Sequence, residues 1–335
     1  MKFHGSLVAL VTPFTAQDRV DEGALKRLVE FHVAGGTTGL VPCGTTGESA
    51  TLSTDEHGQV IETVVQAARG RIPVIAGTGS NNTKEAVSLT AHAKRVGADA
   101  ALLISPYYNR PTQRGLYLHF KAVADSVDLP LILYNIASRT AVNIEPETMA
   151  KLVADCRNIV AVKEASGNLE QMSRILQLTK RRLTLLSGDD ALTLPVLAIG
   201  GTGVISVVAN LVPGDVAAMV EAYEHGKPDE AIRWHDKLSP LTKVMFIETN
   251  PIPVKTAMGI LGVIEPGLRL PLCAMDGANL EKLRAALKAY GLRSRRNTRS
   301  MASPGLRSGR HRGGRGVPRP LGARPAASPA KPKAR

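Results

Sequence analysis

The sequence predicts an α/β protein folded as a (β/α)₈ TIM barrel, a ring of eight parallel strands enclosed by helices. Eight short runs of aliphatic and β-branched residues recur at intervals of about 20 to 35 residues, and most are separated by a stretch with amphipathic helical spacing. The runs are apolar almost throughout, which is typical of strands buried on both faces of a parallel sheet. Eight such units in about 220 residues indicate a closed barrel rather than an open sheet. We expect the strands at residues 7–11, 40–41, 73–76, 100–104, 131–134, 159–163, 184–187 and 204–207.

The segments between these strands carry the signals that begin helices. Thr54 precedes two acidic residues as an expected N-cap, and Asn82 followed by Thr83 marks the start of another helix. The clearest helices are expected at residues 22–32, 55–68, 84–96, 113–126 and 169–178.

The chain is expected to divide into three parts. Residues 1–224 hold the barrel, and beyond them the strand pattern stops. Residues 225–292 form a helical region packed on the barrel, and residues 293–335 are rich in Arg, Gly and Pro. This last segment has too few apolar side chains to offset its ordering entropy, so we expect disorder. Helices of the later part are expected at residues 214–237, 240–260 and 277–290, with a break at 250–253.

The net charge of +13 lies entirely in the last segment. Residues 293–335 hold 13 of the 42 Lys and Arg residues and no Asp or Glu, so residues 1–292 carry 42 − 13 = 29 basic residues against 29 acidic ones. A balanced body does not favour a nucleic-acid-binding protein, because that function calls for a basic surface on the folded part. We therefore expect no nucleic-acid partner.

The cysteines and histidines indicate neither disulfides nor a metal site. Cys43, Cys156 and Cys273 are few, odd in number and far apart, and the eight histidines form no HxH or HExxH pattern. No run approaches the roughly 20 apolar residues of a membrane-spanning helix, and the first apolar run is too short for a signal peptide. We expect a soluble cytoplasmic protein with no membrane partner, metal or cofactor.

Polar residues gather where the predicted strands end. In a parallel barrel the carboxyl ends of the strands converge on one mouth, which is where such enzymes place catalysis. The segments that would meet there are residues 44–48, 106–109, 134–139, 163–164, 187–190 and 203–206.

Lys163 is the sharpest candidate among them. It closes the strand 159–163, and strand alternation puts it on the same face as Ile159 and Ala161. If that face lines the barrel, the amine is partly desolvated, which favours the neutral form that can attack a ketone and form an imine. The alternative is a lysine that extends to solvent or pairs with Glu164.

Three further features at the mouth suit a carboxylate substrate. Tyr134 ends the neighbouring strand, where a phenol could move protons, although it could equally cap a layer of the barrel. The turn 44–47 offers backbone N–H groups and two hydroxyls to a carboxylate or phosphate, but many such turns bind nothing. Arg139 could hold a carboxylate with two hydrogen bonds or be an ordinary surface arginine.

The chain resembles the dihydrodipicolinate synthase / N-acetylneuraminate lyase family over about residues 3–292. The resemblance rests on many motifs in the same order, at residues 11–14, 44–52, 76–79, 106–111, 133–135, 162–165, 186–190 and 250–255. It implies a lyase that condenses pyruvate with L-aspartate-4-semialdehyde in lysine and diaminopimelate biosynthesis.

The resemblance also implies roles for single residues. Lys163 would form the imine with pyruvate, and Tyr134 would be the proton donor and acceptor, linked through Thr45 to Tyr108. In the family this last tyrosine crosses a tight dimer interface, and the usual assembly is a homotetramer, a dimer of dimers.

Substrate and effector binding follow from the same resemblance. Thr46, with the Ile205 carbonyl nearby, would hold the pyruvate carboxylate, and Arg139 would hold that of the semialdehyde. Many members are inhibited by lysine at the dimer interface. The residues that match that effector site are Ser49, Ala50, His57, Asn81, Glu85 and Tyr107.

The sequence departs from the family pattern at two places. Ala137 replaces a proline ahead of Arg139, which frees a backbone dihedral, restores an N–H and puts the placement of Arg139 in question. Thr54 stands where lysine-sensitive enterobacterial members carry a histidine, so weaker or absent feedback inhibition is expected.

Two other functions compete with this one. A sibling aldolase or lyase would use another aldehyde, but Arg139 argues against a sialic-acid lyase, which lacks an arginine there. A catalytically silent barrel with a nucleic-acid-binding tail would use the basic segment, which has no interleaved aromatic residue and no motif. The combination of Thr45, Tyr108, Tyr134 and Lys163 argues against a silent barrel.

Overall fold

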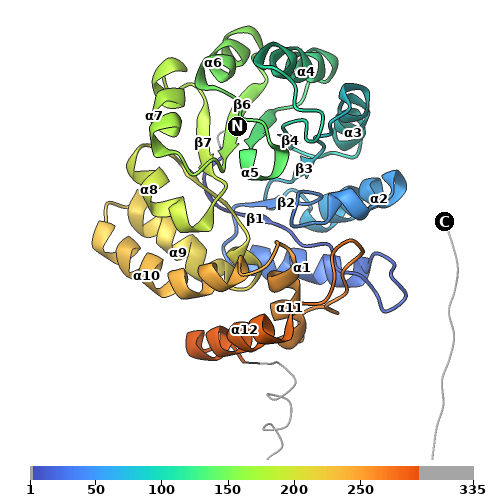
Figure 1. Ribbon diagram of the computed structural model, residues 1–335, viewed down its shortest axis with the longest axis vertical. Coiled ribbons are helices and arrows are strands. Elements are labelled where there is room, and N and C mark those ends of the chain that lie inside the picture. Colours follow the sequence, from blue (N-terminus) through green and yellow to red (C-terminus); the bar gives the residue numbers. More distant parts are fainter. Residues whose placement is uncertain (1–2, 294–335) are drawn as a thin grey trace, which may run out of the picture.

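The computed structural model describes residues 3–293, which form a barrel with a helical region along one side (Figure 1). Residues 294–335, nearly all of the segment predicted to be disordered, lie outside the described residues. Within residues 3–293, no helix is both long enough and apolar enough to cross a membrane.

Eight parallel strands form the barrel, which confirms the predicted fold class. They follow one another around the ring in the order β2-β1-β8-β7-β6-β5-β4-β3. The ring closes between β2 and β3, where Leu40 pairs with Val74 and the Gly77 N–H donates to the Pro42 carbonyl at 2.9 Å. The strands are β1 Gly5–Ala9, β2 Gly39–Val41, β3 Ile75–Gly77, β4 Ala100–Ile104, β5 Leu131–Asn135, β6 Ile159–Glu164, β7 Thr184–Ser187 and β8 Gly203–Ser206.

Helices surround the strands, and the later ones lie beside α1 and α9 (Figure 1). Those of the barrel are α1 Glu22–Ala34, α2 Thr54–Ala68, α3 Thr83–Arg95, α4 Gln113–Ser126, α5 Ala137–Thr140, α6 Pro146–Asp155, α7 Leu169–Leu178, α8 Thr193–Ala198 and α9 Pro213–Glu224. Those that follow are α10 Pro228–Met245, α11 Ile252–Ile260 and α12 Gly277–Tyr290.

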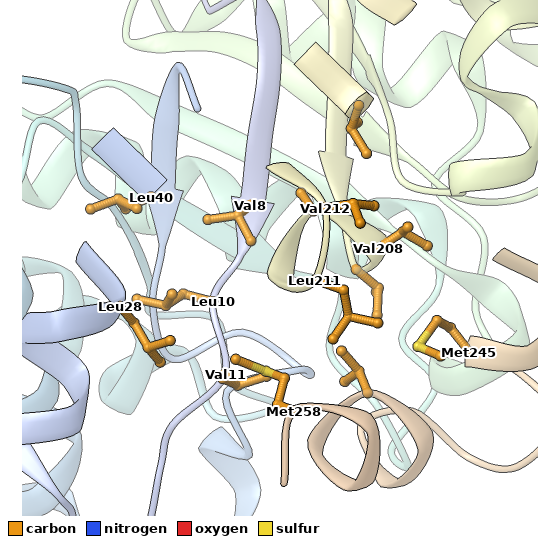
Figure 2. Close-up of a cluster of buried hydrophobic side chains, with 14 of the residues drawn as sticks. Val8, Leu10, Val11, Leu28, Leu40, Val208, Leu211, Val212, Met245 and Met258 are labelled. Atoms are coloured by element: carbon orange, nitrogen blue, oxygen red, sulfur yellow. The ribbon is translucent and has the colours of Figure 1, made fainter. Parts of the chain in front are cut away.

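Strand alternation divides the apolar side chains into two layers. Leu7, Ala9, Ala161 and Leu186 belong to a cluster contributed by residues of all eight strands, which fills the inside of the barrel. The intervening residues point outward, onto the helices. Figure 2 shows this outer layer, where Val8 and Leu40 lie with Met245 and Met258 from the later helices. The helical region after residue 224 therefore shares a continuous core with the barrel.

The predicted helix 214–237 was wrong in its extent, because it is two helices. Gly226 adopts a left-handed φ of 71°, and Pro228 then begins α10 at a position where a proline N–H is not needed. The predicted start at residue 240 was wrong as well, since α10 continues through Pro240. Leu238 and Leu241 on either side are buried, and this packing outweighs the hydrogen bond that the proline removes.

The N-cap of α2 is Ser53 rather than Thr54. The Ser53 hydroxyl accepts the Glu56 N–H at 3.2 Å, and the Glu56 carboxylate accepts the Ser53 N–H at 3.0 Å. This reciprocal capping box stabilises the first turn better than a single cap at Thr54 could. Asn82 caps α3 as predicted.

Candidate active site

Lys163 lies at the carboxyl end of β6, inside the barrel. The parallel register pairs Lys163 with Tyr134 on β5 and with Leu186 on β7. Only 6% of Lys163 is exposed, and its Nζ lies 4.2 Å from the centroid of the Tyr134 ring. The predicted burial of this amine and its position next to Tyr134 are therefore confirmed.

One detail of the strand prediction was wrong. Ala161 faces the barrel interior, as Lys163 does, but Ile159 packs in the outer layer. The register shifts between Leu131 and Ile132, so that Leu131 pairs with Ile159 while Ile132 pairs with Ala161. The extra residue, Val160, interrupts the alternation at the start of β6.

Glu164 does not pair with Lys163, because its carboxylate belongs to a separate buried network. It accepts hydrogen bonds from the Asn135 side chain at 3.0 Å and from the Ser166 N–H at 2.7 Å. Burial raises the pKa of Glu164. Among the ion pairs of residues 3–293, none involves Lys163.

The turn that follows β2, residues 44–48, is held tightly in place; we call it the β2 turn. The Thr12 hydroxyl donates to the Gly47 carbonyl at 2.7 Å, and the Asn250 side-chain amide donates to the Thr46 hydroxyl at 2.9 Å. A Cβ on Gly47 would lie 2.9 Å from the Cys43 nitrogen, so only glycine fits here. Thr46 is buried, and its hydroxyl keeps a hydrogen to donate.

A cavity of about 370 Å³ opens beside these residues. Thr45, Tyr134 and Arg139 line it, while Lys163 lies beside Tyr134 without lining it. Thr46 and Ile205 are buried and are also outside the lining. Tyr108 is 88% exposed in the single chain, with a left-handed φ of 71°, and it too lies outside the lining. Lys163 and Thr46 nevertheless contact residues that line the cavity, Tyr134 and Asn250, whereas Tyr108 lies apart from it.

Arg139 reaches the cavity from α5, the short helix that follows β5. The Arg139 N–H donates to the Ile136 carbonyl at 3.0 Å, so Ala137, which replaces a proline of the family, begins a helical turn. The guanidinium donates to the Asn250 carbonyl at 3.3 Å. The loop without its proline still directs Arg139 to the mouth of the barrel.

The residues predicted for an effector site lie in the same cavity, with one exception. Ser49, Ala50, His57, Glu85 and Tyr107 line the cavity. Asn81 does not, and its carbonyl accepts a hydrogen bond from Asn109 at 2.9 Å. His57 is buried and donates to the Gly77 carbonyl at 2.9 Å. Burial lowers the pKa of its imidazole, so the ring is neutral at neutral pH.

Three residues at the site come from the later helical region and were given no role from the sequence, although Asn250 and Lys255 belong to the motif at residues 250–255. Asn250 contacts both Thr46 and Arg139, as described above. Lys255 forms an ion pair with Glu48 in which both side chains are fully buried. The Arg269 N–H donates to Glu48 at 3.2 Å, and its guanidinium binds Glu56 at 2.6 Å. Lys255 could have been noticed, because it is the only charged residue in α11.

No cluster of three or more His, Cys, Asp or Glu residues that could hold a metal ion occurs in the described part of the chain.

Comparison with known sequences then decides the family. The sequence model of the dihydrodipicolinate synthetase family matches residues 2–290. The chain belongs to this family, as predicted.

Individual members of the family are similar to this chain over almost their whole length. The 4-hydroxy-tetrahydrodipicolinate synthase of Endomicrobium trichonymphae is 56% identical over 290 residues, which cover 87% of this chain and 99% of that protein. The crystal structure of dihydrodipicolinate synthase from Aquifex aeolicus is 54% identical with a TM-score of 0.86, covering 88% of this chain and 100% of that one. The crystal structure of the dihydrodipicolinate synthase from Acinetobacter baumannii in complex with pyruvate is 44% identical, with a TM-score of 0.84. The match covers 86% of this chain and 99% of that one.

The contact between Glu56 and Arg269 predicts a specific acid sensitivity. The hydrogen bonds from Arg269 lower the pKa of Glu56 from 4.5 to about 2. The folded state therefore favours the charged carboxylate, and this contribution to stability is complete above pH 4.5 and is lost as the pH falls towards about 2. We expect Glu56→Gln, which keeps the capping box, to melt below the wild type at neutral pH, with a difference that shrinks over this range.

The measurement is the melting temperature of both proteins as a function of pH. Glu62→Gln is the control, because Glu62 is exposed on the same helix and bonds only to Gln66 among the described side chains. A Glu56→Gln deficit that stays constant down to pH 2 would contradict the expectation.

Proposed function

We propose that this protein condenses pyruvate with L-aspartate-4-semialdehyde to 4-hydroxy-tetrahydrodipicolinate, in lysine and diaminopimelate biosynthesis, through an imine on Lys163. The observation that carries this proposal is the buried Lys163 amine next to Tyr134, at the carboxyl end of β6 inside the barrel. Membership of the family supports it, and so does the pyruvate complex of the A. baumannii synthase. The protein is thus a lyase of the class I aldolase type.

The chemistry follows from the properties of an imine. The Lys163 nitrogen attacks C2 of pyruvate, and the carbonyl oxygen leaves as water. Loss of a proton from C3 gives an enamine, whose carbon attacks the aldehyde carbon and forms the new C–C bond. The aldehyde oxygen takes up a proton and becomes a hydroxyl. The amino group of the second substrate then attacks the imine carbon, which closes the ring and releases Lys163.

Tyr134 moves the protons that these steps require. Its side chain lies in contact with the amine and lines the cavity, so its hydroxyl reaches the reacting atoms. Thr45 links Tyr134 to the Tyr108 side chain of a neighbouring subunit, and through it to solvent.

The two substrates are held by their carboxylates at different places. Thr46 binds the pyruvate carboxylate through its N–H and hydroxyl, and the Ile205 carbonyl lies on the other side. Arg139 binds the carboxylate of the semialdehyde by two charge-assisted hydrogen bonds. Because Asn250 contacts both Thr46 and Arg139, one residue relates the two binding groups.

The protein acts as a homotetramer, in which Tyr108 completes the site of a neighbouring subunit. The 88% exposure of Tyr108 in a single chain supports this role, since a large aromatic ring on a strained backbone is rarely left in solvent. The three cysteines are unpaired, which fits a cytoplasmic location. Lysine is the effector expected at Ser49, Ala50, His57, Asn81, Glu85 and Tyr107, with sensitivity weakened by Thr54.

The imine predicts selective labelling of one lysine. Pyruvate with borohydride should modify Lys163, as detected by peptide mapping, and Lys163→Ala should reduce turnover by several orders of magnitude. Lys151→Ala is the matched control, because Lys151 lies 4.4 Å from the Tyr117 ring but is exposed. Labelling of another lysine, or near-normal turnover of Lys163→Ala, would refute the proposal.

The second prediction separates the two substrates. Arg139→Ala should raise the KM for aspartate-semialdehyde roughly 10- to 100-fold, because a charge-assisted contact with that substrate is lost. The KM for pyruvate should stay nearly unchanged. Steady-state kinetics with each substrate varied in turn measures the effect. Arg174→Ala, on the surface beside Glu147, should change neither value. Equal changes for both substrates would mean that Arg139 is structural, or that another aldehyde is the substrate.

The third prediction tests the sharing of Tyr108. Lys163→Ala and Tyr108→Phe subunits should each have low activity alone. Co-expressed, they should recover roughly a quarter of the wild-type activity, because half of randomly formed dimers are hybrids with one complete site. No recovery in purified hybrids would show that Tyr108 acts within its own chain.

A further inference from the structure

The β2 turn ends in a buried charge that pairs with the later helical region. Glu48 adopts a left-handed φ of 54°, and its side chain and that of Lys255 are both fully excluded from solvent. One carboxylate oxygen accepts from the Lys255 amine, and the other accepts from the Arg269 N–H at 3.2 Å. The Lys255 Nζ also lies 4.1 Å from the centroid of the Phe14 ring. Each oxygen of Glu48 thus has a donor from the same distant part of the chain.

This pair is coupled to the threonines through the backbone of the turn. The Glu48 N–H donates to the Thr45 carbonyl at 3.1 Å, and the Gly47 N–H donates to the Gly44 carbonyl at 3.1 Å. A displacement of Glu48 therefore moves Thr45 and Thr46 with it.

Stability alone gives little reason for a charged pair at this place. The cost of removing two charges from water nearly cancels their attraction, so an apolar pair of similar volume would stabilise the fold about as well. An ion pair differs from an apolar contact in being directional, because its hydrogen bonds fix the position and orientation of the carboxylate relative to the amine. The Glu48–Lys255 pair is therefore suited to setting a position.

We propose that the Glu48–Lys255 ion pair holds the β2 turn in the geometry that binds the pyruvate carboxylate, which makes Lys255 a positioning residue for the first substrate. This inference rests on the proposed function, because it assigns pyruvate to Thr46. Lys255 itself does not form the imine, since its amine is bound to the Glu48 carboxylate and lies in a fully buried ion pair.

The test removes both charges together, so that neither is left buried alone. The variant Glu48→Gln/Lys255→Met keeps similar volumes and an unbranched side chain in place of lysine. We expect it to melt within a few degrees of the wild type. Its KM for pyruvate should rise at least tenfold, and so should the pyruvate concentration that half-saturates borohydride labelling of Lys163. Its KM for the semialdehyde should stay within twofold, because the backbone of Arg139 is held within α5, where its N–H donates to the Ile136 carbonyl.

A matched pair on the surface provides the control. Lys121 and Asp125 form an ion pair at 2.9 Å on α4, and Lys121→Met/Asp125→Asn should leave both KM values unchanged. If the double variant at Glu48 and Lys255 proves unstable, Glu48→Asp keeps the charge but shortens the side chain by one methylene. It should again raise the pyruvate KM without a matching rise for the semialdehyde.

The failures of the two proposals are distinguishable. Wild-type protein that pyruvate and borohydride do not label would refute the imine on Lys163. Labelled wild type, together with variants whose pyruvate dependence equals that of the wild type, would overturn the positioning role and leave the imine intact. A rise in KM that is equal for both substrates would also overturn it, because that result indicates general loosening of the fold.

Discussion

The arrangement of this active site depends on the burial of one amine, that of Lys163, at the end of an apolar strand. A lysine excluded from water normally requires a counter-ion, yet none pairs with it in the described part of the chain, and Glu164 beside it belongs to another network. The Tyr134 ring covers the amine on one side. Parallel pairing fixes the two residues at the same level of the barrel, so neither can move without the sheet.

The helices that follow the barrel repeats belong to the site as much as the strands do. Asn250 contacts Thr46 and Arg139, and Lys255 and Arg269 contact Glu48. The continuous apolar core that the two parts of the chain share fixes the later helices against the barrel, and so keeps these contacts with the β2 turn in place. The same contacts also connect Thr46 and Arg139, the two groups proposed to bind the substrate carboxylates, through one residue, Asn250.

Local patterns predicted the barrel and its main catalytic candidates because both depend on short-range rules. Strand alternation and the position at a strand end were enough to identify Lys163 and Tyr134. The same rules failed for Ile159, because an extra residue shifts the register there. They also failed around Pro240, where the helix continues because the neighbouring leucines are buried. The contacts of Asn250 with Thr46 and of Lys255 with Glu48 were not predicted, because these partners lie about 200 residues away in the sequence and no local pattern records such a contact. Tyr108 is 88% exposed in the single chain, so the contacts predicted for it would come from a second subunit.

The most direct test of the account is a crystal structure of the wild-type protein soaked with pyruvate. The account predicts continuous electron density between the Lys163 Nζ and C2 of pyruvate, with the pyruvate carboxylate on the N–H and hydroxyl of Thr46 and the Tyr134 hydroxyl within hydrogen-bond distance of the imine. Pyruvate bound without a covalent bond to Lys163, or joined to another lysine, would contradict it.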